Sequence, residues 1–508
     1  MSDLCLNNRL EVQRQTLRDR GICVVIPTYN NAGTIVGVVE RAMEQCADVI
    51  VVCDGCTDQT LELLGAMPKQ PAIVAYDKNR GKGAALREGF RYALREGFAY
   101  AITLDGDGQH YPEDIGVLLK ANQRHPGALI VGERKGLEGV ERSRGSKFAN
   151  AFSNFWFAVQ TGQYLRDTQT GYRLYPLKKL KGLSLLTSRY EAELELMVFA
   201  SWHGVKLVSE PVNVFYPPRE ERVSHFRPTK DFARITLLNM VLCLLAVVYG
   251  LPLGVCRFLL KVLRSVYSLS IFIIFTMFIM TPLVHIYLLI GKITERKKLN
   301  LHRMLNFASR FILLYHKIPG MRYTESNPHS EDYKRPAVII CNHQSHLDLM
   351  PLLAQTEKII ILTADWVWNN PLYRFTIRNA EFLPASRGVE VIMPQLRSLV
   401  ERGYSIAIYP EGTRSLDCSI GRFHKGAFYV AQELGVDILP LVLYGTGKAL
   451  PKHGRLLNKW PAHLEIDARI TPAQMKSFGQ TLQEQASSMR KYYKRRYTEI
   501  ANRVEQDV

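Results

Sequence analysis

The chain has 508 residues, enough for two or three domains of ordinary size, and its 47% hydrophobic and 22% charged content describes globular protein with some membrane character. The formal net charge of +18 favours anionic partners such as phosphates or acidic lipids, whereas no zinc-finger spacing or aromatic RNA-binding signature is present, so we expect no nucleic-acid partner. Nine cysteines in a chain of this length exclude a disulfide framework. The N-terminal segment MSDLCLNNRLEVQRQ lacks the apolar core of a secretory signal, so we expect the folded domains to stay cytoplasmic.

The first predicted elements are short apolar strands separated by helical patterns. The expected strands are 22–27, 49–53, 72–76 and 101–104. This alternation predicts an α/β domain with a mainly parallel sheet, in which ligands bind beyond the carboxyl ends of the strands. Asp54 and Asp105 both fall at such ends. Cys53 and Cys56 have CxxC spacing, but no second cysteine pair lies nearby and the motif ends a buried strand, so a redox or zinc role is disfavoured.

The loop Asp105-Gly106-Asp107 predicts a metal site. Two carboxylates two residues apart can share one divalent cation, the glycine lets the backbone bend so that both face the ion, and Gln109 adds a third oxygen on the same side. We therefore expect Mg²⁺ or Mn²⁺ held by Asp105, Asp107 and Gln109. The ion would bridge a diphosphate and offset the charge on a leaving nucleoside diphosphate.

Two apolar runs occupy the middle of the chain, at 235–256 and 266–291, and either is long enough to span a hydrocarbon core of about 30 Å. Two spans would leave both flanking domains on the cytoplasmic side, but they would place Arg257, Lys261 and Arg264 of the link outside, against the positive-inside rule. The alternative is that the first run lies in the membrane interface. We expect one or two membrane helices at 235–291 rather than buried core helices.

A second α/β pattern begins near residue 335. Its expected strands are 337–341, 359–362, 405–409 and 438–443. A basic helix is expected from about 481 to 508, and its charges predict either a solvated helix face or a contact with acidic lipid. The basic residues of this helix include Arg490, Lys491, Lys494, Arg495 and Arg496.

His343 and Asp348 stand in an Asn-His-x-Ser-x-x-Asp frame after an apolar strand. The aspartate can hold the imidazole in one tautomer, while the other ring nitrogen takes a proton from an attacking hydroxyl. No serine or cysteine nucleophile is needed, because the acceptor's own hydroxyl attacks a thioester directly. The segment 410–415, Pro-Glu-Gly-Thr-Arg-Ser, follows another strand and carries an arginine and a glycine suited to a phosphate. The two motifs together predict acyl transfer.

The segment from about 21 to 234 resembles the family 2 glycosyltransferases. This resemblance implies a GT-A fold, a nucleotide-sugar substrate and the metal site described above. VVIPTYNN is similar to the family's first strand and nucleotide-contacting loop, which implies roles for Pro27, Tyr29 and Asn30. VVCDGCTDQT is similar to the second strand and loop, where Asp54 would meet the base or the ribose.

Further motifs extend this resemblance towards the phosphates. NRGKGAALREGF places Lys82 to meet phosphate, and LDGDGQH is similar to the metal motif of the branch that makes polyprenyl-phosphate sugars, with Asp107 in the catalytic set. DTQTGYRLY implies that Arg173 lies near the acceptor or the diphosphate. RYEAELEL is similar to a later acidic motif, which adds Glu191 and Glu193 as site candidates.

The segment ERVSHFRP departs from that branch. His225 stands where a lysine is common, which puts a polyprenyl-phosphate acceptor in doubt. Arg222 in the same segment is still expected to bind phosphate.

The segment from about 266 to 469 resembles the glycerolipid acyltransferases that acylate lysophosphatidic acid. CNHQSHLD and YPEGTRS match two catalytic motifs, and LPASRG is similar to the intermediate motif. The resemblance implies no cofactor and a donor that is acyl-CoA or acyl-carrier protein. TADWVWNNPLYRF differs from the usual lysine-rich helix, so the acyl chain or the acceptor is expected to differ from that of lysophosphatidate. The implied residues are His343 as the base, Asp348 as its orienting partner, Glu411 in the catalytic set, and Arg387, Gly412, Thr413 and Arg414 as acceptor binders.

Together these features predict a bifunctional membrane enzyme of glycolipid or lipid-linked product synthesis. Its expected parts are a glycosyltransferase domain at 1–234, membrane segments at 235–291, an acyltransferase domain at 292–480 and the basic helix at 481–508. The expected partners are a nucleotide sugar, an acyl donor, a lipid acceptor and the acidic leaflet on the cytoplasmic face, which is the inner membrane in a bacterium. The alternative is acyl transfer alone, with the N-terminal domain only binding a nucleotide sugar.

Overall fold

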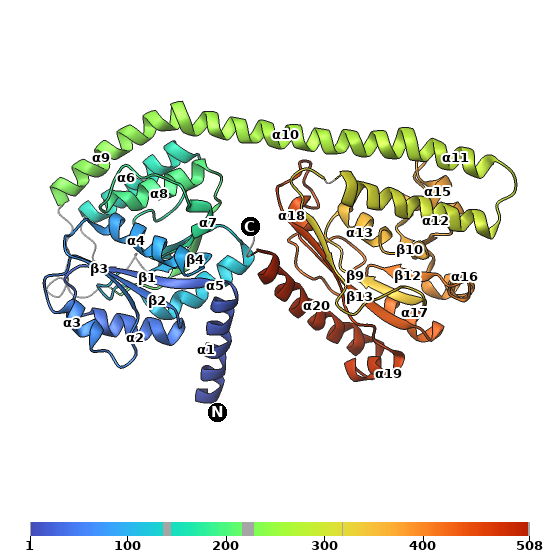
Figure 1. The fold of residues 1–508 in the computed structure, drawn as a ribbon, viewed down its shortest axis with the longest axis horizontal. Coiled ribbons are helices and arrows are strands. Elements are labelled where there is room, and N and C mark those ends of the chain that lie inside the picture. The colour runs from blue at the N-terminus through green and yellow to red at the C-terminus, as the bar shows by residue number, and fades with distance from the viewer. Residues whose placement is uncertain (1, 136–143, 216–227, 317, 506–508) are drawn as a thin grey trace. The chain divides into compact units, whose positions relative to one another are not determined.

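Each half of the chain folds around its own sheet. The computed structural model describes residues 2–135, 144–215, 228–316 and 318–505. The chain divides into two compact units, residues 1–257 and residues 258–508, which we call the N-terminal unit and the C-terminal unit (Figure 1).

The N-terminal unit is built on a seven-stranded sheet. Its strands are β1 (Ile22–Thr28), β2 (Val49–Asp54), β3 (Ala72–Tyr76), β4 (Tyr100–Thr103), β5 (Leu129–Arg134), β6 (Arg173–Pro176) and β7 (Leu207–Val212). Their order is β3-β2-β1-β4-β6-β5-β7, and all neighbours run parallel except that β6 is antiparallel to β4 and β5. Thr28 pairs with Cys53, so the carboxyl ends of β1 and β2 lie level with each other.

Helices cover both faces of this sheet, because alternate strand residues point to opposite faces and both sets are apolar. Val24 of β1 belongs to one core and Val25 to the other. The first core is closed by α1 (Ser2–Asp19), α2 (Ile35–Gln45), α3 (Thr60–Gly65) and α5 (Ile115–Arg124), with the short turn η1 (Pro112–Asp114) before α5. The second core is closed by α4 (Lys82–Arg95), α6 (Arg144–Thr161), α7 (Leu177–Leu180), α8 (Glu191–Trp202) and α9 (Pro228–Leu245).

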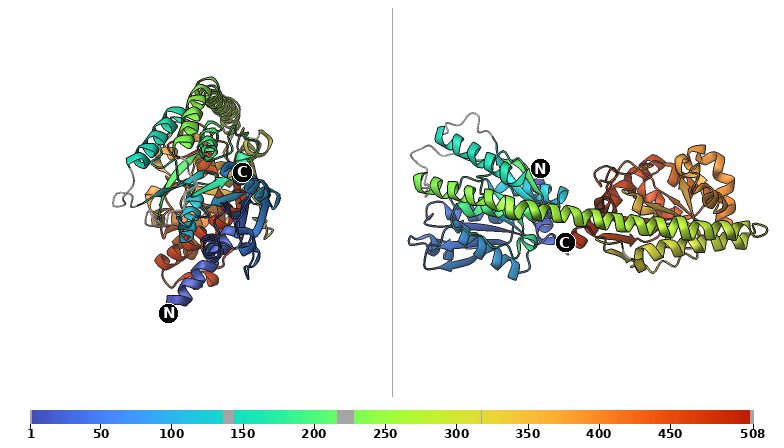
Figure 2. Two further views of the ribbon diagram at one scale, coloured as in Figure 1. Left: turned by 90° about the vertical axis from the view of Figure 1, so that its left-hand side faces the viewer. Right: turned by 90° about the horizontal axis from the view of Figure 1, so that it is seen from above.

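One helical path continues beyond α9, as Figure 2 shows. It runs through η3 (Ala246–Gly250), α10 (Leu251–Ile273) and η4 (Ile274–Met280) to α11 (Thr281–Leu289), and η3 and η4 are π-helical turns. Among the described residues this is the one helix long and apolar enough to cross a membrane; that stretch is Phe232–Leu289, it has 58 residues, and only 6% of its most apolar window is buried. The two apolar runs of the sequence are thus joined in one helix, about 87 Å long at 1.5 Å per residue.

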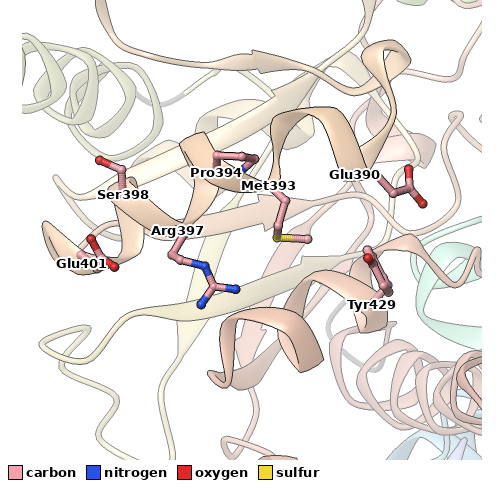
Figure 3. A pocket seen from close by; sticks show the side chains of 7 residues that line it. All are labelled: Glu390, Met393, Pro394, Arg397, Ser398, Glu401 and Tyr429. Carbon is pink, nitrogen blue, oxygen red and sulfur yellow. The ribbon is translucent and has the colours of Figure 1, made fainter.

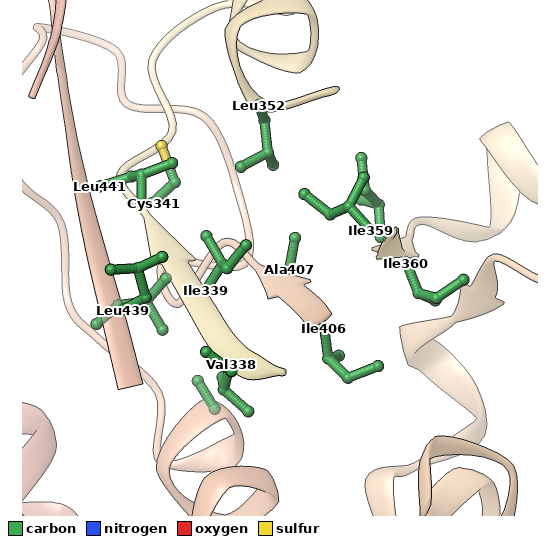
Figure 4. Packing of buried hydrophobic residues seen from close by; sticks show 14 of the residues in the cluster. Val338, Ile339, Cys341, Leu352, Ile359, Ile360, Ile406, Ala407, Leu439 and Leu441 are labelled. Atoms are coloured by element: carbon green, nitrogen blue, oxygen red, sulfur yellow. The ribbon is translucent and has the colours of Figure 1, made fainter. Parts of the chain in front are cut away.

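The C-terminal unit has its own seven-stranded sheet. Its strands are β8 (Tyr323–Ser326), β9 (Ala337–Cys341), β10 (Ile359–Thr363), β11 (Leu383–Pro384), β12 (Ser405–Ile408), β13 (Asp437–Tyr444) and β14 (Ala462–Ile466). The order is β11-β10-β12-β9-β13-β14-β8, and only the pair β13–β14 is antiparallel. Figure 4 shows the core on the central strands, where Val338, Ile339, Ile406 and Leu439 are among the buried side chains.

Helices and short helical turns surround this second sheet. They are α12 (Glu295–Arg310), η5 (Phe311–His316), η6 (His346–Asp348), α13 (Leu349–Leu353), α14 (Asp365–Trp368), α15 (Arg374–Asn379), η7 (Ala385–Arg387), α16 (Val389–Glu401), α17 (Gly426–Leu434), α18 (Thr446–Ala449), α19 (Pro472–Met475), η8 (Lys476–Phe478) and α20 (Leu482–Glu505).

The basic helix α20 is docked on this unit. The Tyr493 hydroxyl, fully buried, donates to the carbonyl of Ile340 in β9 at 2.7 Å. Arg496 pairs with Glu465 of β14 and, at 2.9 Å, with Asp467, and both carboxylates are buried. Arg496 therefore serves neither of the two roles expected for the basic residues of this helix, because it neutralises buried acids of the sheet.

Candidate active sites

The first candidate site lies at the carboxyl ends of β1, β2 and β4. Asp105 follows β4, and the Lys82 ammonium at the start of α4 lies 2.7 Å from Asp105 Oδ1 and 2.9 Å from Glu193 Oε2 of α8. We call Lys82, Asp105 and Glu193 the lysine cluster. Burial opposes the charge on Lys82, but the two carboxylates outweigh burial and raise the pKa of Lys82 above its usual value. One lysine thus joins three segments that are far apart in the sequence.

Asp107 differs from Asp105 although both belong to one loop. Burial opposes ionisation of Asp105, but Lys82 lowers the pKa of Asp105 below its usual value. Burial and the neighbouring Asp105 raise the pKa of Asp107 to about 6. Its Oδ1 accepts the backbone N–H of Gln109 at 3.0 Å. A cation beside Asp107 would remove the cost of holding this second negative charge.

The loop fits a divalent cation on the chemistry of its donors. Within the described residues no group of three or more His, Cys, Asp or Glu side chains is arranged to hold a metal ion. The protein would therefore supply the carboxylates of Asp105 and Asp107 and the amide of Gln109, and a nucleotide diphosphate would supply the remaining oxygens. Mg²⁺ is commonly bound in this way, by one or two carboxylates together with substrate phosphates.

Gly171 and Arg173 support the lysine cluster. A Cβ atom at Gly171 would lie 2.6 Å from Asp105 Oδ2 and 2.8 Å from Lys82 Nζ, so only glycine leaves room for this ion pair. Arg173 is 1% exposed, and its guanidinium donates to backbone carbonyls at 2.9 and 3.0 Å. The sequence places Arg173 near the acceptor or the diphosphate; in the structure it is enclosed by protein and lies behind Glu193.

Asp54 and Asn30 fix the loops that the sequence assigns to the nucleotide. The buried carboxylate of Asp54 accepts the backbone N–H of Arg80 at 2.7 Å and that of Gly81 at 2.8 Å. The Asn30 side-chain oxygen accepts the backbone N–H of Thr57 at 2.8 Å. These bonds hold the ends of β1 and β2 and the start of α4 in place. Both of Asp54's oxygens are thus bonded to backbone of its own unit.

The other residues expected in this half lie in several places. Pro27 is buried within β1, Tyr29 is half-buried in the loop that follows, and Glu191 is buried in the first turn of α8. Arg222 and His225 fall outside the described residues.

The second candidate site lies at the end of β9. His343 Nδ1 is 2.9 Å from Asp348 Oδ2, and Asp348 is fully buried. The same oxygen accepts the backbone N–H groups of Gln344 and Ser345 at 2.6 and 2.8 Å. Ser345 and Asp348 also form a capping box that starts η6. With Asp348 fixed in this way, the imidazole is oriented through Nδ1 and leaves Nε2 to take a proton.

Glu411 ties the two predicted acyl-transfer motifs together. Its Oε1 accepts the N–H of His343 at 2.9 Å, and its Oε2 accepts the N–H of Gly421 at 2.6 Å. The N–H of Ser415 donates to the carbonyl of His343 at 2.8 Å. Burial raises the pKa of Glu411, although the two N–H donors oppose the shift. Glu411 therefore holds the loop that carries His343 in place through hydrogen bonds to backbone N–H groups.

Tyr409 contacts His343 and was not among the residues that the sequence predicted. It follows β12, and its ring stacks on the His343 ring with centroids 4.1 Å apart and planes at 20°. The signal available in the sequence was its position, one residue before the motif Pro410–Ser415. His346, three residues after His343, has a pKa lowered by burial and then by Arg414 and His343.

Basic side chains lie at the segments predicted to bind the acceptor. The Lys452 ammonium donates to Thr413 Oγ1 at 3.2 Å and to the carbonyl of Arg414 at 2.9 Å. Arg387 lies over the Trp368 ring, 5.7 Å from its centroid. Gly412 and Thr413 are exposed and Arg414 is half-buried, so all three are accessible to a ligand. The sequence motifs did not include Lys452.

A separate shallow pocket of about 500 Å³ lies between α16 and α17 (Figure 3). Its lining is mixed, with Met393 and Arg397 from α16 and Tyr429 from α17. None of the residues expected in the acyl-transfer site lines it, so it stands apart from the dyad.

Two family profiles match separate parts of the chain. Residues 23–178 match glycosyl transferase family 2, and residues 320–444 match the acyltransferase family. The two resemblances seen in the sequence motifs are thereby confirmed.

Similar proteins carry one half each. The polyprenol monophosphomannose synthase of Mycolicibacterium smegmatis is 34% identical over 218 residues, which cover 40% of this chain and 79% of that protein. A chloroplastic 1-acyl-sn-glycerol-3-phosphate acyltransferase of Arabidopsis thaliana is 33% identical over 149 residues, which cover 28% of this chain and 41% of that protein. The chain therefore spans less than half the length of that acyltransferase. The crystal structure of the 1-acyl-sn-glycerophosphate acyltransferase of Thermotoga maritima aligns with a TM-score of 0.40 and 19% identity, over 49% of this chain and 98% of that one.

Proposed function

Because the chain belongs to the family 2 glycosyltransferases through its N-terminal part and carries a glycerolipid-type acyltransferase domain in its C-terminal part, we propose that it is a bifunctional membrane enzyme that transfers both a sugar and an acyl group. The proposed product is a glycolipid or a lipid-linked sugar. A tether between the two domains would raise the effective concentration of a shared intermediate.

The sugar-transfer half is proposed to use a nucleotide sugar. An oxygen of the acceptor attacks the anomeric carbon, the bond from that carbon to the diphosphate breaks, and the nucleoside diphosphate leaves with the electron pair. Lys82 lies beside the loop of Asp105 and Asp107 and supplies positive charge next to the diphosphate. A bound Mg²⁺ or Mn²⁺ held by Asp105, Asp107 and Gln109 would offset the charge on the leaving group. The lysine cluster at the sheet edge carries this half of the proposal.

The acyl-transfer half is proposed to use acyl-CoA or acyl-carrier protein. The acceptor hydroxyl gives its proton to His343 Nε2 and attacks the thioester carbonyl. The carbon–sulfur bond then breaks, and the thiolate leaves and regains a proton from the imidazolium. Asp348 stabilises that imidazolium through Nδ1. Arg387 and Arg414 are proposed to bind an anionic acceptor.

The acceptor of the sugar is proposed to be an amphiphile with a phosphate head. A phosphate brings no proton that a base must remove. The similarity to a polyprenol monophosphomannose synthase favours such an acceptor, whereas His225 is a departure from that branch.

The apolar helix is proposed to hold the enzyme on a membrane. Only 6% of the most apolar window within its stretch Phe232–Leu289 is buried, and its 58 residues far exceed the roughly 20 that one crossing needs. We assign sugar transfer to 1–234, the membrane helix to 235–291 and acyl transfer to 292–480, with 481–508 as part of the acyl-transfer unit.

The test separates the two reactions in one full-length chain. Asp107→Ala should abolish sugar transfer and keep acyl transfer, and His343→Ala should do the reverse, as followed by mass spectrometry of lipid extracts from cells expressing each variant. Wild-type extracts should gain the masses of a hexose and an acyl group. Wild-type extracts that gain only the acyl mass, unchanged by Asp107→Ala, would favour acyl transfer alone. Acyl transfer that survives His343→Ala would overturn the proposed base.

A further inference from the structure

An apolar groove of about 440 Å³ runs along α4 of the N-terminal unit. One wall is α4, and the other is formed by α7, the loop after it and the start of α8. The groove is lined mainly by apolar side chains and is of a size that binds small ligands. Its apolar residues include Leu86, Phe90, Leu94, Leu183, Leu185 and Leu196.

The walls of this groove are held in place without a ligand. Glu195 of α8 is fully buried, and its carboxylate accepts the N–H of Thr187 at 2.9 Å and the hydroxyl of Thr187 at 2.6 Å. The loop that carries Leu183 and Leu185 is therefore anchored to α8. On the other side Gly83 lets α4 approach α8 closely, since a Cβ at Gly83 would lie 2.3 Å from the Cβ of Ala192. The groove is thus preformed. Leu94, Leu183 and Leu185 stay partly exposed in it, whereas Leu86 and Leu196 are buried.

The rim of the groove is basic. Arg87, Arg91, Arg95 and Lys181 line it, and no acidic side chain does. Arg91 is partly neutralised by Glu88 at 2.6 Å, whereas Arg87 contacts only a backbone carbonyl, that of Thr187, among the bonds described for it. An apolar floor with a cationic rim is complementary to a hydrocarbon chain that ends in an anion.

One end of the groove is lined by residues that are next in sequence to the lysine cluster. Gly83 lines the groove and directly follows Lys82, and Ala192 lines it and lies between Glu191 and Glu193. Arg87 lies about one helical turn further along α4. From Gly83 to Leu94 the groove follows α4 for about 16 Å.

We propose that this groove binds the hydrocarbon chain of a single-chain anionic amphiphile, with the anionic head at the Arg87 end. The inference rests on the proposed sugar transfer, because it identifies that amphiphile as the acceptor. The chain would lie along Phe90, Leu94 and Leu183, and the head would reach the lysine cluster.

The test uses the purified full-length chain in phosphatidylcholine nanodiscs with a photoactivatable dodecyl phosphate as the probe. Labelling should map to peptides that contain residues 86–94 and 183–196. Dodecyl phosphate should compete, and dodecyl maltoside, which has the same chain and a neutral head, should not. The double variant Leu94→Glu and Leu183→Glu should lose labelling by roughly 10-fold or more, because it places charge on the apolar floor. Leu61→Glu on α3 is the matched control and should keep labelling within about twofold of wild type.

Thermal melting confirms that the variants fold, and the binding of the nucleotide sugar is measured on the same samples. The groove variant should retain nucleotide binding and lose transfer to a lipid acceptor. Labelling that maps elsewhere, or that is unchanged by the groove variant, would overturn the proposal. Lost labelling with unchanged lipid transfer would overturn the acceptor role. A failure of the proposed sugar transfer is distinct, because then the wild type transfers no sugar while groove labelling persists.

A variant of the basic rim distinguishes binding of the amphiphile in the groove from a general attraction of basic residues to the membrane. Arg91→Glu with Lys181→Glu is compared with Lys69→Glu and Lys120→Glu, which lie outside the groove. The proposal expects the rim variant to weaken probe labelling more than the control pair does. Equal weakening in both pairs would indicate charge-driven membrane contact and overturn the proposal.

Discussion

His343 depends on a residue that its own motif does not contain. The Tyr409 ring stacks on the imidazole, and the Tyr409 hydroxyl is buried without a hydrogen-bond partner among the described residues. The contribution of Tyr409 is therefore its ring, which keeps the imidazole in line with Asp348. Tyr409→Ala should lower kcat for acyl transfer about 10-fold with little change in KM, because stacking positions the base rather than binding substrate. Tyr409→Phe is the matched control and should stay within about twofold. An equal loss in both variants would show that the hydroxyl matters.

The positive charge of Lys82 offsets the negative charges of Asp105 and Glu193 in the candidate sugar-transfer site. Lys82→Met removes the cation and leaves Asp105 and Glu193 largely buried without it, so the free energy of unfolding of the N-terminal unit should fall by about 3–5 kcal/mol. Urea denaturation followed by circular dichroism measures this. Adding Glu193→Gln to Lys82→Met should recover part of the loss, because one stranded charge is then gone. No recovery in the double variant would contradict the assigned ion pairs.

Glu331 and Arg469 give the C-terminal unit a pH-dependent contribution to stability. The guanidinium makes two hydrogen bonds to the carboxylate, at 2.6 and 2.7 Å, and holds the pKa of Glu331 below its usual value. A carboxyl whose folded pKa is lowered stabilises the fold above its unfolded pKa, and this contribution is lost as the pH falls through the folded pKa. Glu331→Gln should therefore cost about 1–3 kcal/mol at pH 7. The gap to wild type should close below about pH 4. A gap that stays constant in melts from pH 7 to pH 3 would contradict the ion pair.

At the scale of whole elements, the buried parallel strands were predictable and several others were not. The α/β class and both expected domain types are confirmed. β1, β2, β9 and β13 are nearly continuous apolar runs, which is the sequence pattern expected of a strand that is buried on both faces. β14 was missed because Glu465 and His463 interrupt its apolar pattern. Their partners, Arg496 and Arg503, come from α20, and no local pattern links these segments.

In the candidate sites too, positions set by local sequence were predictable, and contacts between distant segments were not. The sequence placed His343, Asp348 and the Asp105 loop correctly at strand ends, because such ends meet at one edge of a sheet. It could not show that Lys82 bonds to Asp105 and Glu193, since that contact depends on how α4 and α8 pack. The site assignments themselves stay predictions.

The docking of α20 predicts that substitutions of the adjacent residues Arg495 and Arg496 have different effects on stability. Arg496 pairs with the buried Glu465 and Asp467, whereas the Arg495 side chain is 68% exposed. Arg496→Met should destabilise the C-terminal unit by about 3–5 kcal/mol, because it leaves buried carboxylates unpaired. Arg495→Met should change stability by less than about 0.5 kcal/mol. Thermal melts of the full chain measure both, and equal effects would contradict the docking role of Arg496.

At the scale of the whole molecule, the apolar helix predicts membrane binding through its outward face. Leu244, Leu251 and Phe258 are each more than half exposed on it. Changing all three to glutamate should weaken binding to phosphatidylglycerol vesicles by more than roughly 100-fold, because each side chain contributes about 1.5–3 kcal/mol when it leaves water. Vesicle flotation measures this.

The control for this triple variant is a second one with the same added charge at exposed apolar residues elsewhere. It carries Leu61→Glu, Val391→Glu and Leu416→Glu. It should float with the vesicles as wild type does. Similar release of both triple variants would mean that added negative charge, and not loss of the apolar face, removes the chain from the membrane.

The carboxylates of Asp54 and Glu411 each accept two backbone hydrogen bonds, and this predicts how mutant alleles at these positions behave. Each residue belongs to a sequence motif, yet both oxygens of each carboxylate accept hydrogen bonds from backbone N–H groups of neighbouring loops. A loss-of-function allele at either position is therefore expected to loosen a loop. Asp54→Asn and Glu411→Gln keep the shape but replace an acceptor with a donor that faces an N–H. Such alleles should behave as temperature-sensitive, active in the cold and lost on warming, whereas His343→Ala is inactive at every temperature.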